Sequence, residues 1–239
     1  TRKFIGARRD FRPMPRSYFT HELQQLRDEI MIMASMVYQQ LTDAVTSLRT
    51  SDLEMAKRVI AQDMEINRRR FMLEDQTLTI IATQAPMAGD MRFLAGALEI
   101  ISELERIGDY GKGISRITLM LGRDSGLVMP ARLGVMAEKA LSMLRRSVTA
   151  FVSGDVEAAR AIPLEDDEVD LLYNQASYEL VETIMANPKM ISLANLYSWA
   201  AHNIERTADR STNICERTIY MVTGEMRELD HQEESMSGL

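Results

Sequence analysis

The sequence predicts an all-α protein, a tandem repeat of two three-helix bundles with six long helices and an elongated shape. Three observations support this class. Ala, Leu, Met, Glu and Arg, which favour helices, are abundant, whereas the 12 glycines and 6 prolines lie mostly near expected element ends. The alternation of β-branched, aromatic and polar residues that is typical of strands is almost absent. The motif Glu-Arg-x-x-Asp occurs twice, one hundred residues apart, beginning at Glu105 and at Glu205.

The first bundle is expected over residues 20–122, with Thr20 as the N-cap of its first helix. Ser51 and Glu54 have the spacing of a capping box, which should open the second helix, and Pro86 should end it. The three expected helices cover residues 20–49, 52–85 and 89–121.

The second bundle is expected over residues 131–225, after a linker marked by two glycines and Pro130. The segment 154–157 occupies the place of the earlier capping box, and Gly224 can stop the last helix. The three expected helices cover residues 131–153, 156–186 and 191–222. The plan of the first bundle is therefore repeated.

Two terminal segments lie outside the bundles, a basic arm over residues 1–19 and a polar tail over residues 226–239. The arm is interpreted as a solubilising tail, or else as a contact to an acidic partner or an anionic membrane surface. The net charge of −7 argues against a nucleic-acid partner, because such proteins carry a basic surface.

Cys215 is the only cysteine, which excludes an intramolecular disulfide and a Cys-based zinc cluster. No apolar run approaches the length of a membrane span, and no signal-peptide pattern is present. We therefore expect a cytoplasmic protein whose membrane association is only peripheral, through its partners.

Each Glu-Arg-x-x-Asp copy follows a second polar pair by about forty residues, and both pairs have the i,i+4 spacing that places side chains on one helix face. Suppose that the two helices of each half turn back at Pro86 in the first half and at Asn187-Pro188 in the second. The earlier polar pair and the Glu/Asp pair of the motif would then lie at the same level of each helical hairpin. The residues expected to form metal sites are Asp63, Asn67, Glu105 and Asp109 in the first half, and Asp166, Asp170, Glu205 and Asp209 in the second.

Carboxylate and amide oxygens are hard ligands that suit iron, manganese, magnesium or calcium better than zinc. The alternative is that arginines, among them Arg106 and Arg206, neutralise the acids in a metal-free interaction module. A carboxylate-bridged metalloenzyme is a further alternative. No catalytic residues are expected, since no Ser/His/Asp set, phosphate loop or nucleophilic cysteine can be assembled, and the two Glu-x-x-His motifs of di-iron oxidases are missing from the helices.

The motifs resemble those of the PhoU family of phosphate-transport accessory regulators. The first-repeat signature is similar to residues 84–92 followed by 104–109, and the second to residues 204–209 followed by Asn213-Ile214 and 219–225. The resemblance implies a non-enzymatic regulator with paired three-helix bundles whose acidic motifs hold metal ions, including multinuclear clusters. The implied partners are the ATPase subunit of the phosphate ABC transporter and a membrane sensor histidine kinase, and a homodimer is implied as well.

Several positions depart from the family pattern. Asn67 stands where the family usually has Asp, and Gly113 where it has Asn. Tyr110 and Arg210 stand where His is frequent, and Thr207-Ala208 replaces Ile-Gly in the second motif. These departures weaken the expectation of a metal most in the first half.

Overall fold

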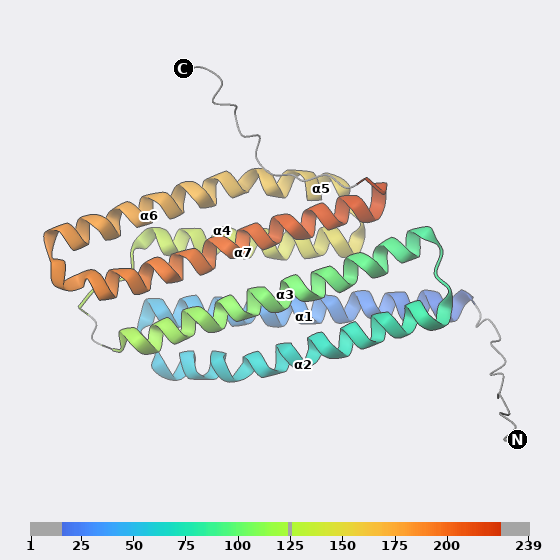
Figure 1. Ribbon diagram of the computed structural model, residues 1–239, viewed down its shortest axis with the longest axis horizontal. Coiled ribbons are helices and arrows are strands. Elements are labelled where there is room, and N and C mark those ends of the chain that lie inside the picture. Colours follow the sequence, from blue (N-terminus) through green and yellow to red (C-terminus); the bar gives the residue numbers. More distant parts are fainter. Residues whose placement is uncertain (1–15, 124–125, 226–239) are drawn as a thin grey trace, which may run out of the picture.

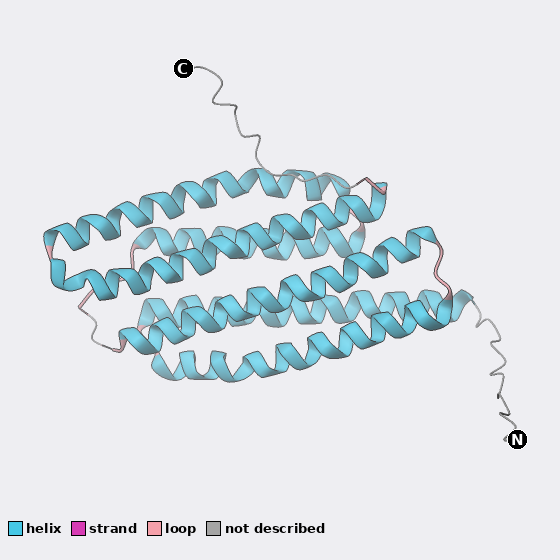
Figure 2. Cartoon of the chain, in the orientation of Figure 1, coloured by secondary structure: helices cyan, strands magenta, loops and turns pink. Residues whose placement is uncertain are grey.

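The computed structural model describes residues 16–123 and 126–225, and this part of the chain is helical without strands (Figure 2). The predicted all-α class is confirmed. The elements in chain order are α1 (Arg16–Thr50), α2 (Leu53–Gln84), α3 (Ala88–Leu121), α4 (Ala131–Ser153), α5 (Val156–Ala161), the 3-10 helix η1 (Ile162–Glu165), α6 (Asp166–Ala186), the 3-10 helix η2 (Pro188–Met190) and α7 (Ile191–Thr223).

The helices form two three-helix bundles that lie side by side (Figure 1). α1, α2 and α3 make the first bundle, and α4, the segment α5–η1–α6, and α7 make the second. α3 packs along α7 and α1 packs along α4, so these four helices join the repeats, while α2 and α6 lie at opposite edges. At 1.5 Å per residue the longest helices extend roughly 50 Å, which gives the expected elongated shape.

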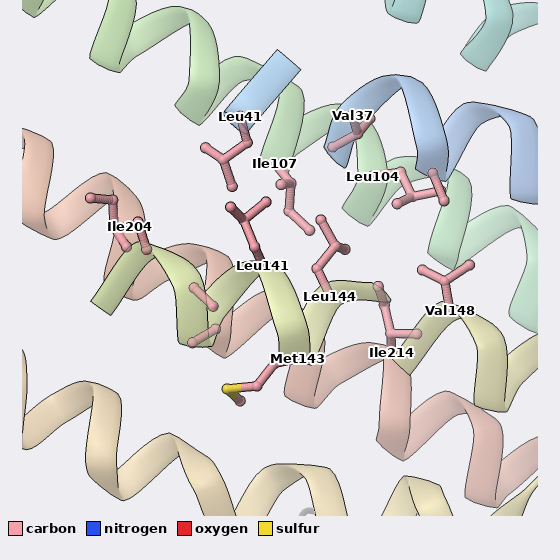
Figure 3. Close-up of a cluster of buried hydrophobic side chains, with 14 of the residues drawn as sticks. Val37, Leu41, Leu104, Ile107, Leu141, Met143, Leu144, Val148, Ile204 and Ile214 are labelled. Atoms are coloured by element: carbon pink, nitrogen blue, oxygen red, sulfur yellow. The ribbon is translucent and has the colours of Figure 1, made fainter. Parts of the chain in front are cut away.

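One continuous apolar core runs through both repeats. Figure 3 shows Leu141, Leu144 and Val148 of α4 facing Leu41 and Ile107 of the first repeat, and all of these side chains are buried. Each such side chain contributes about 1.5–3 kcal/mol of transfer free energy when it leaves water. The repeats are therefore fixed to each other by core packing, and this positions the acidic motifs of α3 and α7.

The boundary between α1 and α2 differs from the predicted capping box. Ser51 adopts a left-handed conformation with φ 53°, and the N–H of Asp52 donates to Ser47 O at the end of α1. Asp52 is then the N-cap, since its Oδ1 accepts from Glu54 N at 3.0 Å and Met55 N at 2.9 Å. The prediction of Ser51 as the cap was wrong because Ser51 closes the preceding helix.

Two helix boundaries also differ from expectation. α1 begins at Arg16, one turn before the predicted cap Thr20 and directly after Pro15 in the sequence, a residue type that is tolerated at a helix start. The expected fifth helix is broken into α5, η1 and α6, because Pro163 has no N–H to continue the α-helical bonding.

Residues 1–15 and 226–239 lie outside the described residues, and with them most of the predicted arm and all of the predicted tail. Within the described residues, no helix has both the length and the apolar character needed to cross a membrane.

Candidate metal centres

The acidic motif of the first repeat lies on a helix face that approaches α1 closely. A Cβ atom at Gly108 would lie 3.1 Å from Gln40 Oε1, and one at Gly111 would lie 3.5 Å from the Leu41 backbone. Both Gly108 and Gly111 are buried. A side chain at Gly108 would require Gln40 to shift, whereas one at Gly111 would make ordinary contact with α1, so the motif helix lies against α1 at both positions.

A lysine ammonium occupies the centre of the first-repeat cluster. Lys112 Nζ lies 2.5 Å from Asp63 Oδ2 and 3.6 Å from Asp109 Oδ1, so it joins the two acids from α2 and α3. The Asp63 side chain is 3 % exposed, whereas that of Asp109 is 53 % exposed. Asn67 Nδ2 donates to Asp63 Oδ2 at 3.2 Å. The hydrogen bond to Asp63 raises the pKa of Lys112 against the effect of its partial burial, so this amine stays charged.

A second cation neutralises the remaining acid of the first repeat. Arg70 Nη1 donates to Glu105 Oε1 at 3.0 Å, and its Nε donates to Glu74 Oε1 at 2.9 Å. These bonds, with that to Glu74 the stronger, raise the pKa of Arg70. Each predicted carboxylate of the first repeat is thus in contact with a side-chain cation.

The second repeat places its acids together under a different electrostatic balance. Burial raises the pKa of Glu205 to about 7, and the charges of Asp209, Asp170 and Asp166 add to this effect, while Arg206 opposes it. Burial and the charge of Asp170 likewise raise the pKa of Asp209. Ionising these carboxyls together is unfavourable because neighbouring like charges repel. The acids of α6 therefore lie near enough to those of α7 for their charges to affect the pKa values of Glu205 and Asp209.

The basic residues nearest the second cluster are engaged elsewhere. Arg206 Nε donates to Tyr110 Oη at 3.1 Å, and Arg210 Nε donates to the same oxygen at 3.3 Å. Arg210 Nη1 also lies 3.3 Å from Glu103 Oε2. Two of the departures from the family pattern, Tyr110 and Arg210, are therefore partners in one contact between the repeats.

His202 is the other basic side chain beside the second cluster. Its Nδ1 lies 3.2 Å from Glu205 Oε2, one turn earlier on α7, and this oxygen has no hydrogen-bond partner of suitable geometry. The imidazole ring also lies 6.5 Å from the ring of Tyr173 on α6. With a neutral imidazole, the positive charge that acts on Glu205 is that of Arg206.

The two clusters differ in how well they fit a metal ion. Among the described residues, no three His, Cys, Asp or Glu side chains stand close enough together to hold one. In the first repeat Lys112 and Arg70 already supply positive charge at the carboxylates, so these residues do not fit a metal. The second repeat offers Asp166, Asp170, Glu205 and Asp209, of which Glu205 and Asp209 have raised pKa values, and carboxylate oxygens are ligands that suit a hard cation.

Three residues important to these clusters were missed by the sequence interpretation: Lys112, Arg70 and His202. Lys112 follows Asp109 by three residues, and His202 precedes Glu205 by three, so both stand on the motif face by helical spacing. Arg70 could not be found in this way, because it reaches Glu105 across the hairpin. The predicted neutralising residue Arg106 contacts Glu103 at 4.0 Å instead and is half exposed.

Comparison with known proteins gives the same two-repeat division. The family model described as PhoU domain matches residues 30–118 and again residues 133–218. A phosphate-specific transport system accessory protein PhoU homolog of Rhizobium meliloti (strain 1021) is 32% identical over 222 residues, covering 92% of this chain and 94% of its own. The phosphate-specific transport system accessory protein PhoU of Escherichia coli (strain K12) is 33% identical over 207 residues, covering 87% and 86%.

Solved structures resemble the fold over nearly its full length. The crystal structure of the phosphate transport system regulatory protein PhoU from Streptococcus pneumoniae has a TM-score of 0.82 at 30% identity, covering 88% of this chain and 100% of its own. The crystal structure of PhoU from Pseudomonas aeruginosa also has a TM-score of 0.82 at 30% identity, covering 87% and 100%. The predicted tandem arrangement is confirmed by these neighbours.

Proposed function

Because this chain belongs to the PhoU family, whose domain model matches both of its repeats, we propose that it is an accessory regulator of phosphate uptake and phosphate-starvation signalling. The match across both repeats is the observation that carries this proposal. Relatives that cover nearly the whole chain bear the name of a transport-system accessory protein, and the protein would act at the cytoplasmic face of that transporter.

The proposed role is that of an adaptor, without a catalytic step. Its partners would be the ATPase subunit of the phosphate ABC transporter and a sensor histidine kinase, whose output it would damp when phosphate is plentiful. The rigid joint between the repeats supports this role, since the core through α1, α3, α4 and α7 presents the two outer helices in a fixed relation.

Metal binding belongs to the second repeat in this proposal. Asp166, Asp170, Glu205 and Asp209 would hold iron, manganese or magnesium, as a single ion or a multinuclear cluster. A bound cation would supply positive charge that offsets the mutual repulsion of these acids, in a structural role. The raised pKa values of Glu205 and Asp209, each with burial and the charge of Asp170 among its causes, support this assignment. Asp63, Asn67, Glu105 and Asp109 would instead remain the metal-free half, held by Lys112 and Arg70.

The regulatory role is tested in cells from which this protein has been removed and to which the full chain or a variant is returned. In phosphate-rich medium, its absence should raise both the uptake of radiolabelled phosphate and the activity of a starvation-induced phosphatase, and the full chain should restore both. The ATPase subunit should co-purify with the returned protein. Unchanged uptake and phosphatase activity would refute the regulatory proposal.

The contribution of the metal is tested with Glu205→Ala/Asp209→Ala in the same cells. This variant should fail to restore repression, whereas Asp75→Ala/Glu138→Ala, which removes two exposed carboxylates elsewhere, should restore it. Steady turnover of a phosphoester or a peroxide by the metal-loaded protein would instead favour the metalloenzyme alternative.

A further inference from the structure

A pocket between α1 and α2, here called the α1–α2 pocket, is a feature of the first repeat that the regulatory proposal leaves unexplained. Its volume is about 610 Å³, within the range of about 300–1,000 Å³ that small-molecule sites occupy. Met31, Ile32 and Met36 of α1 and Ile66 of α2 form its apolar wall. Small-molecule sites combine such a wall with a few polar groups that fix the ligand. The polar groups therefore decide what this pocket can hold.

Gln40 supplies a buried polar group at the inner end of the α1–α2 pocket. It lines the pocket and is 2 % exposed. Gln40 and Ile66 both lie against α3, since a Cβ atom at Gly108 would be 3.1 Å from Gln40 Oε1 and 3.4 Å from Ile66 Cγ2. Neither Oε1 nor Nε2 of Gln40 has a hydrogen-bond partner among the described residues. A buried amide without partners is unfavourable, so its position beside a pocket indicates that a ligand completes its bonding.

The other polar residues of the pocket are bonded elsewhere or meet solvent. Ser35 Oγ donates to a backbone carbonyl one turn earlier on α1, and Gln39 Nε2 donates to a carboxylate one turn later, both at 2.9 Å. Among the described residues that line the pocket, only Glu65 is charged, and it pairs with Arg68 at 2.7 Å. Gln62 is exposed. The pocket thus offers a ligand one free carboxamide and no unpaired charge.

The free carboxamide determines the chemical class of the ligand. A glutamine side chain presents an acceptor and a donor side by side, so an edge that carries a donor beside an acceptor satisfies both at once. Primary amides and lactams have such an edge, and so does adenine, whose N6 and N7 pair with glutamine in this way. A flat ring next to that edge suits Met31 and Met36, because thioethers make favourable contacts with aromatic rings.

We propose that the α1–α2 pocket binds a small, uncharged, aromatic molecule whose amide-type edge bonds to the carboxamide of Gln40. The two polar atoms of Gln40 are shielded from solvent, so a ligand must move a neighbouring side chain to reach them. Met31 and Met36 are unbranched and adapt most readily. The inference goes beyond the proposed regulatory function, because it concerns binding alone and holds whether or not the protein binds metal or a transporter.

The test compares two small probes, benzamide and acetophenone. They have the same number of non-hydrogen atoms, but acetophenone carries a methyl group in place of the amide nitrogen and so has no donor. Binding to the full chain is followed by NMR, from the shifts of the methionine methyl groups and of the Gln40 side-chain amide. Probes of this size should bind with a Kd of about 1–10 mM. Benzamide should bind about fivefold more tightly than acetophenone, because it makes one more hydrogen bond.

Gln40→Met keeps the length of the side chain and removes the amide. The preference should then reverse in favour of acetophenone, because the amide nitrogen of benzamide has lost its partner. Without any probe, this variant should unfold at a midpoint about 2–4 °C higher, since an apolar side chain replaces an unpaired buried amide. Gln25→Met, which changes an exposed glutamine of the same helix outside the pocket, should keep the preference of the wild-type chain.

Ser35→Trp separates binding in this pocket from binding elsewhere. Ser35 is exposed at the rim, so an indole there should fill the pocket without disturbing the fold, which circular dichroism checks. Neither probe should then bind. A wild-type chain that does not bind benzamide would overturn the proposal. So would equal affinity of the wild-type chain for the two probes, a preference for benzamide that survives in Gln40→Met, or binding that persists in Ser35→Trp.

Discussion

The two repeats carry the same Glu-Arg-x-x-Asp motif on equivalent helices, α3 and α7, but surround it with opposite electrostatics. In the first repeat, the Lys112 ammonium joins Asp63 to Asp109, and Arg70 neutralises Glu105. In the second, burial and the charge of Asp170 raise the pKa values of both Glu205 and Asp209, while Arg206 and Arg210 bond to Tyr110.

The difference shows that a ligand motif alone does not define a metal site. The equivalent polar positions contact internal cations in the first repeat, whereas in the second they include two carboxyls whose pKa values are raised. Lys112 stands one helical turn beyond Asp109, and the equivalent position of the second repeat is Thr212. This one difference is part of what gives the first cluster its own positive charge.

The largest expected effect comes from removing that internal cation. Lys112→Met leaves Asp63 buried without its ammonium partner, and breaking such a pair from one side should lower the free energy of unfolding by about 3 kcal/mol. Urea denaturation in chelator-treated buffer measures this. The control Lys57→Met breaks an exposed pair with Glu54 and should change stability by less than about 0.5 kcal/mol.

Adding Asp63→Asn to Lys112→Met should recover more than half of the lost stability, because the buried charge is then absent. Equal stability of Lys112→Met and Lys57→Met would show that the ammonium does not hold the first repeat together.

The next prediction is a gain in the free energy of unfolding, and it concerns the second repeat. The pKa of Glu205 is about 7 in the folded protein against an ordinary value of 4.5, so the folded state binds this proton more tightly than the unfolded state. Stability of the metal-free protein therefore falls as pH rises from 4.5 to 7 and stays lower above it. Glu205→Gln should raise the free energy of unfolding by on the order of 1 kcal/mol at pH 8, after allowance for solvent screening, and by almost nothing near pH 4.5.

Denaturation of chelator-treated Glu205→Gln at both pH values gives this comparison, with Glu182→Gln, an exposed acid on α6, as the matched control. A Glu205→Gln variant that is less stable than the wild-type chain at pH 8 would contradict the assignment of unfavourable charge to the second repeat.

A smaller effect is expected at the contact between the repeats. Tyr110→Phe removes the oxygen that accepts from both Arg206 and Arg210 while keeping the ring, which should cost about 1 kcal/mol. Tyr178→Phe removes a hydroxyl from an exposed tyrosine and should be within about 0.5 kcal/mol of the wild-type chain. Thermal unfolding separates the two, and identical midpoints would mean that Tyr110 does not anchor the arginines.

The smallest effect distinguishes the equivalent helix caps. Asp52 accepts from two backbone N–H groups, whereas Asp155, which caps α5, accepts only from Ala158 N at 3.0 Å. Asp52→Ala should cost about 1 kcal/mol and Asp155→Ala about half of that, on the usual scale for N-caps. Paired denaturation curves measure the difference, and a larger loss in Asp155→Ala would reverse this ranking.

Sequence reasoning reached the architecture because helical periodicity, few glycines and prolines, and a duplicated motif are local or repeated signals. The turns at Ala85–Pro86 and Asn187–Pro188 followed from proline chemistry. It was harder to predict which of two neighbouring residues caps a helix and where a helix is interrupted. Ser51 and Asp52 are both good caps, and only the backbone of Ser51 decided which one serves α2. Pro163 was overlooked inside an expected continuous helix.

The candidate residues were also readable from spacing, but their charge environment was not. The reach of Arg70 across the hairpin depends on the register between α2 and α3, and the raised pKa of Glu205 depends on burial between α6 and α7. The engagement of Arg206 and Arg210 by Tyr110 depends on how the repeats pack. These are tertiary properties, so identical motifs could not reveal from sequence how the charge balance of the two halves differs.

The most direct measurement is the metal content, by mass spectrometry, of the full chain purified without an affinity tag, beside Glu205→Ala/Asp209→Ala and Glu105→Ala/Asp109→Ala. The account predicts near-stoichiometric iron, manganese or magnesium in the wild-type chain, its loss in the second-repeat variant, and its retention in the first-repeat variant. Metal lost only from the first-repeat variant, or a folded wild-type chain without metal, would contradict the assignment of the metal site to the second repeat.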